Sequence, residues 1–572
     1  MNKLTILFML IYIKSYFAID CINCYAYTML SPVRELSKIL HGQVSTAEKT
    51  RLFFSTDGSI FKVMPQAVIY PKNQDDIINT IKVLNWSAQE GKKINLTARG
   101  KGTDQGGGAL GTGVVLVLPA HMKGLIDITK TTVTVQPGMI YSHLQGILQS
   151  HWQYLPPYPA SIDFCSVGGA VANNAAGEKT LKYGATRNWV KSLKVVLSNG
   201  DVIETTRLNK KQLRKKKEQP DFEGHLYRAV DDLLMQNSDL LRNTKLRVSK
   251  NSTGYDLWDI KGKDGSFDLS QLFIGSQGTL GIVTEITFHT APYNPHTTLL
   301  VGYYEDIKQA EAAVQSILPL NPSAAEMVDF HTLEFMKEHK PEMLKGMDIN
   351  NLPKLILLIE FDDHKQKDRN KKAKRAWKTL NQSASVVRRA EKLSDQEMLW
   401  HIRRGAAAVI WSHPGAKKAL PIIEDGIVPL DKMTEYLERS YALFKKYNIK
   451  IATWGHAGNA NMHMQPFLDL SNMRDRAKVF NLTDDYYKMV IKLGGSTSAE
   501  HNDGIMRGPY LKALFGAKVY RLFEEVKDLF DPLNFLNPDV KLNVTRQDAM
   551  IKMRKEYSIR QLYENLPSTY NH

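Results

Sequence analysis

The chain has 572 residues, of which 43% are hydrophobic and 23% charged, as in soluble globular proteins of about two to four domains. Its three cysteines exclude a disulfide framework, and also an iron–sulfur cluster because such a cluster usually takes four thiolates. The net charge of +16 lies largely in polar runs at 209–217 and 365–375 that carry no aromatic residues for stacking bases. We therefore expect solvated faces and no nucleic-acid binding, with an anionic membrane surface or an acidic partner protein as the alternative.

The N-terminal extension, residues 1–30, contains the short apolar run LTILFMLIYI at 4–13. This run is too short for a transmembrane helix, and no convincing small-x-small cleavage site follows it. A signal peptide, a membrane-touching anchor helix and a mis-set start codon stay open. The sequence has no other long apolar run, so we expect a cytoplasmic protein, with peripheral membrane contact as the alternative.

Strands and helices alternate from about residue 57 to 290. The segment PKNQDD (71–76) offers a proline and an acidic first turn, which predicts a helix between two strands. The second of these strands, INLTARG (94–100), runs into a glycine turn. Further strands are predicted at 114–119, 132–138, 192–205 and 281–290, and the third of these contains a hairpin turn at Asn199-Gly200.

A second region begins near Pro292. Residues 299–318 and 354–380 each predict a strand followed by a helix, which favours an α+β sheet with helices packed on one face. Helical and loop segments are expected from there to about residue 542. The polar residues 546–572 are expected to form an appended tail.

Three glycine-rich loops follow strands in the first region, at 98–111, 166–189 and 274–285. The first has glycines at 100, 102 and 106, which is not the GxGxxG of a nicotinamide-binding turn, and the GxxxxGK[ST] of a P-loop is also missing. Backbone N–H groups can approach an anion closely where side chains are absent. Three such loops indicate a large phosphate-bearing cofactor, and a glycine-rich structural domain is the alternative.

Several ordered motifs carry a family resemblance. The segments MPQAVIYPKNQDDI, ARGKGTDQGGG, SVGGAVANNAAG…KYG and GSQGTLGIVTE resemble the FAD-binding domain of the vanillyl-alcohol-oxidase-like, PCMH-type flavoproteins. The segments LWHIRRG, EDGIVP, HAGNANMH, GGSTSAEHNDGIMR and DPLNFLNPD are similar to the D-lactate dehydrogenase, glycolate oxidase and D-2-hydroxyglutarate dehydrogenase branch. The resemblance runs from about residue 31 to 545 and is greatest to the flavin half of larger flavin plus iron–sulfur fusions.

The resemblance implies an α+β fold in several parts. A PCMH-type FAD-binding domain of two subdomains would span 31–291, and an α+β substrate or cap domain would span 292–500. A helical C-terminal segment, 501–545, would complete the active site before the tail.

The resemblance also assigns the glycine-rich loops to FAD. The binding is expected to be noncovalent, because Thr103 stands where some members carry a histidine that bonds the flavin. The residues implied are Arg99, Gly100, Lys101, Gly102, Thr103, Gly106, Gly107, Ser166, Gly168, Gly169, Asn173, Asn174, Gly177, Tyr183, Gly184, Gly275, Ser276, Gly278, Thr279, Gly281, Ile282 and Asn537.

The C-terminal motifs imply the chemistry. Oxidation of a 2-hydroxy acid removes a proton from the hydroxyl and sends a hydride from the α-carbon to flavin N5, and a divalent metal on the hydroxyl lowers its pKa. By motif, His456, His463 and Glu500 match the family's ligands for Zn²⁺ or another divalent metal. His501 matches the general base, and Arg403, rather than Arg404, matches the arginine that binds the substrate carboxylate.

The chain departs from the family pattern around this site. Asn459 and Ala460 stand for aspartate and glycine, and Ala499 and Asn502 stand for glycines. Gln277 and Asp539 also differ from the common glutamate and glycine. Loss of the aspartate is expected to weaken the orientation of a histidine, and Ala460 and Ala499 are suspect where φ must be positive.

The function implied is an FAD-dependent D-2-hydroxyacid dehydrogenase that passes electrons to a quinone, a cytochrome or a separate iron–sulfur subunit. An oxidase that uses O₂, a glycolate-oxidase-type subunit, and a degenerate FAD-binding subunit without turnover stay open. A small 2-hydroxy acid needs only the arginine that binds its carboxylate. A dicarboxylate needs a second cationic side chain, which the sequence does not identify.

Overall fold

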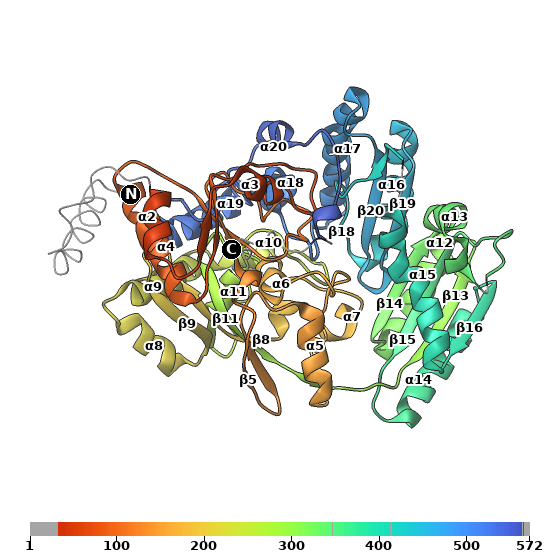
Figure 1. Ribbon diagram of the computed structural model, residues 1–572. Helices are drawn as coiled ribbons and strands as arrows, with labels where there is room; N and C mark the ends of the chain where they lie inside the picture. Colours follow the sequence, from red (N-terminus) through yellow and green to blue (C-terminus); the bar gives the residue numbers. More distant parts are fainter. Residues whose placement is uncertain (1–31, 346, 412–414, 563, 565–572) are drawn as a thin grey trace.

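The computed structural model describes residues 32–345, 347–411, 415–562 and 564 (Figure 1). The apolar run at 4–13 lies outside the described residues. Within the described chain, no helix is both long and apolar enough to span a bilayer.

The first subdomain is a four-stranded sheet in the order β1-β2-β4-β3. Two of its three strand pairs are parallel, β2 with β4 and β3 with β4, and β1 pairs with β2 antiparallel. The predicted helix is confirmed as α4, and it begins after Asn73, whose side chain accepts from the Asp76 backbone N–H. The bounds are β1 Gln43–Ser45, β2 Ala67–Tyr70, α4 Gln74–Gln89, β3 Leu96–Arg99 and β4 Val114–Val117.

The second subdomain is a six-stranded antiparallel sheet in the order β10-β9-β8-β11-β6-β5. The hairpin expected at Asn199-Gly200 is confirmed, and Gly200 has a φ of +87°. The bounds are β5 Leu125–Ile128, β6 Thr132–Val135, β8 Val190–Val196, β9 Val202–Leu208, β10 Phe267–Asp268 and β11 Ile282–His289. Helices α5 Tyr141–Ser150, α6 Val167–Asn173 and α9 Phe222–Gln236 contribute to its core.

The second region is a large antiparallel sheet in the order β16-β13-β15-β14-β19-β20-β17, with β18 paired to β20. Its strands are β13 Thr298–Tyr304, β14 Ala324–Asp329, β15 Leu355–Phe361, β16 Val386–Ala390, β17 Lys418–Ala419, β18 Gly426–Ile427, β19 Ile451–His456 and β20 Asn461–Leu468. The loops and helices expected after residue 380 therefore contain strands that the sequence reading missed. These include β19 and β20, which are buried along their whole length.

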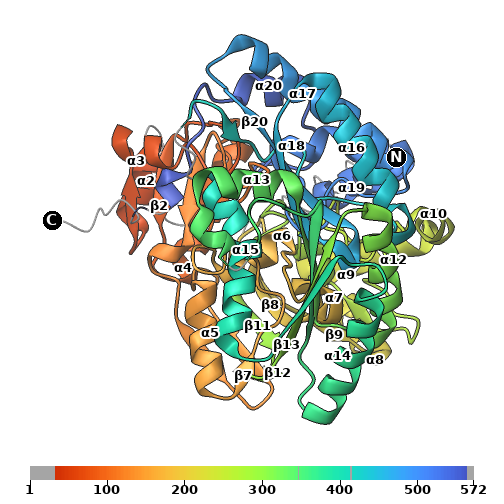
Figure 2. The same ribbon diagram turned by 90° about the vertical axis from the view of Figure 1, so that its right-hand side faces the viewer.

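Helices cover both faces of this sheet, which corrects the expectation of a single covered face. Side chains of α12 Ile307–Ile317, α14 Gln366–Leu380, α16 Met433–Tyr447 and α17 Met473–Lys492 share one core. Those of α13 Phe330–His339 and α15 Leu393–Trp411 share another. Figure 2 shows the sheet between the two groups of helices. Alternate residues of each strand point to opposite faces, so a strand buried on both sides supplies both cores.

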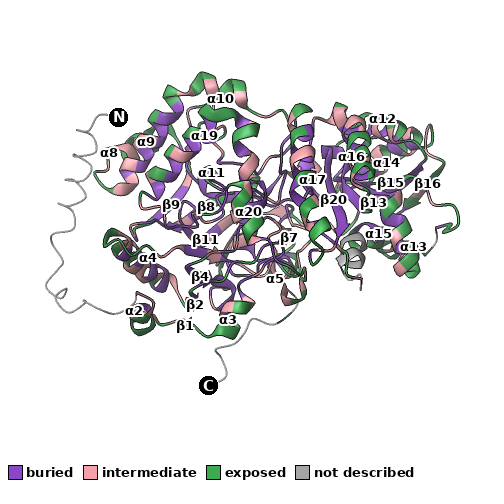
Figure 3. Cartoon of the chain, turned by 90° about the horizontal axis from the view of Figure 1, so that it is seen from above, coloured by how far each residue is buried: buried purple, intermediate pink, exposed green. Residues whose placement is uncertain are grey.

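The basic runs lie on solvent-facing helices, as expected. The run at 209–217 forms most of α8 Lys210–Glu218, in which Leu213 is the buried residue. The run at 365–375 falls on α14 and exposes most of its lysines. Figure 3 shows exposed residues on the peripheral helices and buried residues along the strands.

The C-terminal part returns to the first region. Helix α19, Leu511–Phe530, shares the core of the second subdomain. The chain after residue 546 is not a free tail over its first part: α20 forms at Arg546–Lys552, and the Arg554 N–H donates to the Ile60 carbonyl at 3.0 Å. The Tyr557 hydroxyl donates to the Gly58 carbonyl at 2.9 Å. Polar composition misled here because these backbone contacts carry no sequence signature.

Candidate active site

A cavity of about 930 Å³ lies where the two subdomains, the large sheet and the C-terminal segment meet. The three glycine-rich loops form one part of its wall. The predicted cofactor residues that line it are Arg99, Gly100, Lys101, Gly102, Thr103, Ser166, Gly168, Gly169, Asn173, Gly177, Tyr183, Ser276, Gly278, Gly281 and Ile282. A volume of this size and a wall rich in backbone suit a dinucleotide.

The other predicted cofactor residues do not line the cavity: Gly106, Gly107, Asn174, Gly184, Gly275, Thr279 and Asn537. Asn537 has a supporting role instead. Its amide donates to the carbonyls of Gly108 at 2.9 Å and Gln277 at 2.8 Å, so it joins the first loop to the third.

Arg99 and Lys101 differ in what their side chains can offer an anion. The Arg99 guanidinium is buried and donates to the Thr56 carbonyl at 2.8 Å and, at 3.4 Å, to that of Ala109. The side chain of Arg99 is therefore committed to the protein. Lys101 is half-buried and lines the cavity, and it has no ion-pair partner among the described residues. Lys101 is the better candidate for contact with a pyrophosphate.

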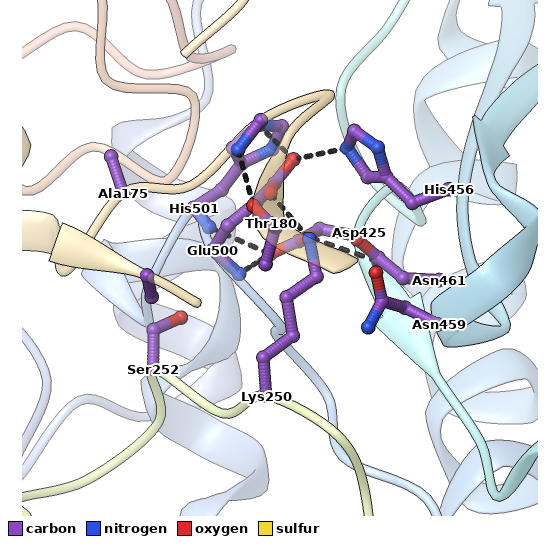
Figure 4. A network of polar contacts seen from close by, with 12 residues as sticks. Ala175, Thr180, Lys250, Ser252, Asp425, His456, Asn459, Asn461, Glu500 and His501 are labelled. Carbon is purple, nitrogen blue, oxygen red and sulfur yellow. Dashed lines mark hydrogen bonds and ion pairs between the residues drawn. The ribbon is translucent and has the colours of Figure 1, made fainter. Parts of the chain in front are cut away.

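The two histidines of HAGNANMH lie on paired strands. His456 ends β19 and His463 lies in β20, opposite Trp454. Residues two apart in a strand share a face, so His456 points to the same side as Trp454. His463, which stands opposite Trp454, points to that side as well. Glu500 and His501 come from the loop after α17 and meet them there. Figure 4 shows Glu500 between His456 and Lys250, with His501 beside it.

Three ligand-type atoms converge in this cluster. The Glu500 Oε1 atom lies 3.0 Å from His456 Nε2 and 3.2 Å from His463 Nε2, and the two Nε2 atoms are 3.4 Å apart. Ligands held about 2.0–2.2 Å from a tetrahedral Zn²⁺ lie roughly 3.3–3.6 Å from one another. The donor set and spacing fit a divalent metal, and all three side chains are buried.

Acidic residues surround the cluster and orient it. Glu326 Oε1 lies 2.8 Å from His456 Nδ1, and Glu424 Oε2 lies 2.6 Å from His501 Nδ1 and 3.4 Å from His463 Nδ1. Asp425 accepts the backbone N–H groups of Glu500 at 2.9 Å and His501 at 2.7 Å. A carboxylate hydrogen-bonded to Nδ1, as Glu326 is to that of His456, fixes the tautomer and ring angle of a histidine ligand.

Charge outweighs burial in setting the pKa values of the cluster. Burial lowers the pKa of His501, but Glu424 and Asp425 raise it to about 9. Burial raises the pKa of Glu500, but Lys250, at 2.5 Å, and His456 hold it well below its usual range. Burial likewise lowers the pKa of His456, and Glu326 raises it above its ordinary value. In the absence of a metal, the negative charge of the carboxylates is therefore balanced by protons on the histidines and by the Lys250 ammonium.

The two adjacent arginines have different partners. Arg403 is buried, lines the cavity and pairs with Glu326, with Nη2 2.8 Å from Oε2. Arg404 also lines the cavity but forks onto Glu178, with contacts of 2.9 and 2.7 Å to its two oxygens. Each guanidinium thus spends its Nε and Nη2 atoms on a carboxylate of the protein. Arg403 lies nearer the imidazole cluster, because Glu326 contacts both Arg403 and His456.

The departures from the family pattern separate into strained and unstrained positions. Ala460 has a φ of +51° and Asn502 a φ of +67°, both in the left-handed region. Ala499 does not, so its substitution needs no strained backbone. The Asn459 amide donates to the Ser249 hydroxyl at 2.9 Å and contacts neither imidazole. The side chain of Asn459 therefore orients neither histidine.

Four residues of the cluster went unrecognised in the sequence: Lys250, Glu326, Glu424 and Asp425. Glu424 and Asp425 begin the motif EDGIVP, and two adjacent acids before an apolar strand offered a signal. Glu326 is the one charged residue within the apolar run AAEMV, which was a weaker signal. The sequence around Lys250 offers no signal, because its partner Glu500 lies 250 residues away.

Two domain families match the chain. The FAD binding domain matches residues 65–206, and the C-terminal domain of FAD linked oxidases matches residues 294–540. Curated relatives include the D-2-hydroxyglutarate dehydrogenase of Pseudomonas putida, 26% identical over 87% of this chain and 50% of that protein. The glycolate oxidase subunit GlcD of Bacillus subtilis is 28% identical over 85% of this chain and 91% of its own. The chain spans about half the length of the D-2-hydroxyglutarate dehydrogenases that it matches.

Solved structures share the fold. The 4-ethylphenol oxidase from Gulosibacter chungangensis superposes with a TM-score of 0.63 and 18% identity, over 90% of this chain and 97% of that one. The p-cresol methylhydroxylase gives 0.64 and 15%, over 88% and 95%. Likeness at this identity shows the fold alone, and it confirms the PCMH-type architecture expected from the motifs. Both domain families are matched in order, so the chain carries an FAD binding domain followed by the C-terminal domain of FAD linked oxidases, the domain pair of an FAD-linked oxidoreductase.

Proposed function

We propose that this protein is an FAD-dependent dehydrogenase that oxidises a D-2-hydroxy acid to the 2-oxo acid. The observation that carries the proposal is that His456, His463, Glu500 and Arg403 line the same cavity as the glycine-rich loops. The names of the relatives, which act on 2-hydroxyglutarate, lactate and glycolate, support this substrate class.

The side chains divide the work of binding. Arg403 presents a buried guanidinium that suits the substrate carboxylate, and bidentate contact to it would fix the α-carbon. His456, His463 and Glu500 would hold a divalent metal, with room left for the hydroxyl. When bound, the metal supplies acidity to the hydroxyl, and FAD supplies the acceptor for the hydride.

His501 would take the hydroxyl proton. Its Nδ1 faces Glu424, which leaves Nε2 directed toward Glu500 at 3.8 Å. Glu424 stabilises the imidazolium after the proton arrives, in the manner of a carboxylate behind a catalytic histidine. The proton would thus end on His501, and FAD, when bound, would supply the acceptor for the electron pair.

The electron acceptor is proposed to be a quinone, a cytochrome or a separate iron–sulfur subunit. The three cysteines of the chain cannot ligate an iron–sulfur cluster of their own. Turnover with a dye acceptor under nitrogen, compared with peroxide formation in air, separates a dehydrogenase from an oxidase.

Anaerobic bleaching of the flavin tests the proposal directly. Protein loaded with FAD and Zn²⁺ is mixed with D-lactate, glycolate and D-2-hydroxyglutarate, and the flavin absorbance is followed under argon. We expect bleaching by at least one of these acids and no bleaching by L-lactate or L-2-hydroxyglutarate. No bleaching by any of them, with cofactor and metal both bound, would instead support an FAD-binding subunit without turnover.

A further inference from the structure

One buried carboxylate touches two parts of the candidate site. Glu326 lies on β14 and is 1% exposed. Its Oε1 atom is 2.8 Å from His456 Nδ1, and its Oε2 atom is 2.9 Å from Arg403 Nε and 2.8 Å from Arg403 Nη2. Glu326 therefore bridges a candidate metal ligand and the candidate carboxylate clamp.

The sheet holds this bridge in place. Strands β14 and β19 pair at Met327 with Gly455, which brings Glu326 beside His456 on the neighbouring strand. Arg403 reaches the same carboxylate from α15, which packs on β14 through the core that it shares with the sheet. The bridge thus joins a strand, its neighbour and the helix above them.

Each contact has a chemical consequence. A carboxylate on Nδ1 holds that proton and leaves Nε2 of His456 to face Glu500 and His463. Two contacts to one oxygen fix the plane of the Arg403 guanidinium and balance its buried charge. The remaining N–H groups of Arg403 are left for the cavity that it lines.

We propose that Glu326 is a positioning residue that sets the separation between the metal ligands and the carboxylate clamp. The proposal rests on the proposed function. In a 2-hydroxy acid, the hydroxyl and the carboxylate lie on adjacent carbons. A site that binds both groups therefore needs its metal ligands and its arginine close together. A single carboxylate bonded to both elements enforces that closeness, and it selects against 3-hydroxy acids.

A purely structural ion pair is the competing explanation. Such a pair would stabilise the fold without affecting metal or anion affinity. Glu360 supplies a matched control, because it is a buried carboxylate on the adjacent strand β15 that lines the same cavity, pairs with Lys179 and contacts neither His456 nor Arg403.

The experiment compares E326Q and E360Q with the wild-type holoprotein. Zn²⁺ affinity is measured by competition with a chromogenic chelator on FAD-loaded protein. Oxalate affinity is measured by the flavin absorbance change in chelator-treated protein, so it reports the guanidinium without the metal. We expect E326Q to weaken Zn²⁺ binding about 10–100-fold, the range seen when the partner of a histidine ligand is lost, and to weaken oxalate binding as well. E360Q should change neither.

The outcomes separate the inference from the proposed function. Zn²⁺ and oxalate affinities of E326Q equal to those of E360Q would overturn the inference. A lower melting temperature in E326Q with unchanged affinities would overturn it too, in favour of the structural pair. Wild-type protein that binds Zn²⁺ and oxalate but is bleached by no hydroxy acid would defeat the proposed function and leave Glu326 in its positioning role. A lower ratio of kcat/KM for D-lactate over D-3-hydroxybutyrate in E326Q would support the selectivity.

Discussion

At the scale of single residues, His501 is governed by opposing effects. Burial disfavours its charged form, yet Glu424 at 2.6 Å and Asp425 raise its pKa to about 9. His501 is expected to hold its proton this firmly only while no metal is bound at the site. A divalent cation beside Glu500 would repel that proton and return His501 toward the neutral form that a base requires.

The pKa of His501 predicts a pH-dependent stability for the metal-free protein. Because the folded value of about 9 lies above the unfolded value of 6.5, the contribution is full below pH 6.5 and is lost as the pH rises to 9. The full effect is at most about 3 kcal/mol. Urea unfolding of chelator-treated protein at pH 6.5 and 9.5 measures it. His501→Gln should flatten the difference, and an equal difference in the variant would show that another group titrates.

Asn459 provides a second prediction at this scale. Its amide bonds Ser249 at 2.9 Å and no ligand histidine, so Asn459→Asp should leave Zn²⁺ affinity within about threefold of the wild type. Chelator competition gives the measurement. A tenfold or larger change would mean that the position acts on the metal site through contacts outside those of its side chain.

At the scale of elements, the segment after α20 closes part of the cavity. Tyr557, Ile559 and Leu562 line it, and the Arg554 backbone is bonded to the loop that contains Gly58. A chain that ends at Met553 should therefore bind FAD at least about tenfold more weakly, or about 1.4 kcal/mol, than one that ends at Leu562. Titration by flavin fluorescence compares the two. Equal affinities would show that the segment covers the cavity without contributing to cofactor binding.

The elements also show how far sequence reasoning reaches. Periodic segments such as α4, and the strand and helix over 299–318, are predictable because their own residues determine them. The motif HAGNANMH is recognisable, but its position between two buried strands is not, because β19 and β20 are buried on both faces and lack an alternating pattern. Glu326 and Lys250 escape prediction for a related reason: their partners are 130 and 250 residues away.

At the scale of the whole molecule, the C-terminal segment is fastened by a buried ion pair. Lys541 and Asp503 are both fully buried, and the Lys541 ammonium also donates to the Gly254 carbonyl at 2.8 Å. Asp503 accepts from the Gly254 N–H at 2.9 Å, so the contacts of both partners with Gly254 join the C-terminal segment to the FAD-binding domain.

Removal of one partner of this pair should be costly. Lys541→Met leaves the Asp503 carboxylate buried without its cation, and we expect a loss of about 3–5 kcal/mol in the free energy of unfolding. Lys552→Met is the control, because Lys552 lies 3.6 Å from an exposed Asp539 and should cost less than about 1 kcal/mol. Urea denaturation measures both, and similar losses would show that the Lys541 pair is solvated.

The pairing of β19 with β20 has a consequence for how the HAGNANMH turn can vary among related chains. His456 stands opposite Asn461, and His463 opposite Trp454. One inserted or deleted residue between the strands would shift the register by one and send His463 to the far side of the sheet. Substitutions such as Asn459 and Ala460 leave the register intact. Variation in this turn is therefore more restricted in length than in composition, so a gap in an alignment here is a stronger sign of a lost site than a substitution between the two histidines.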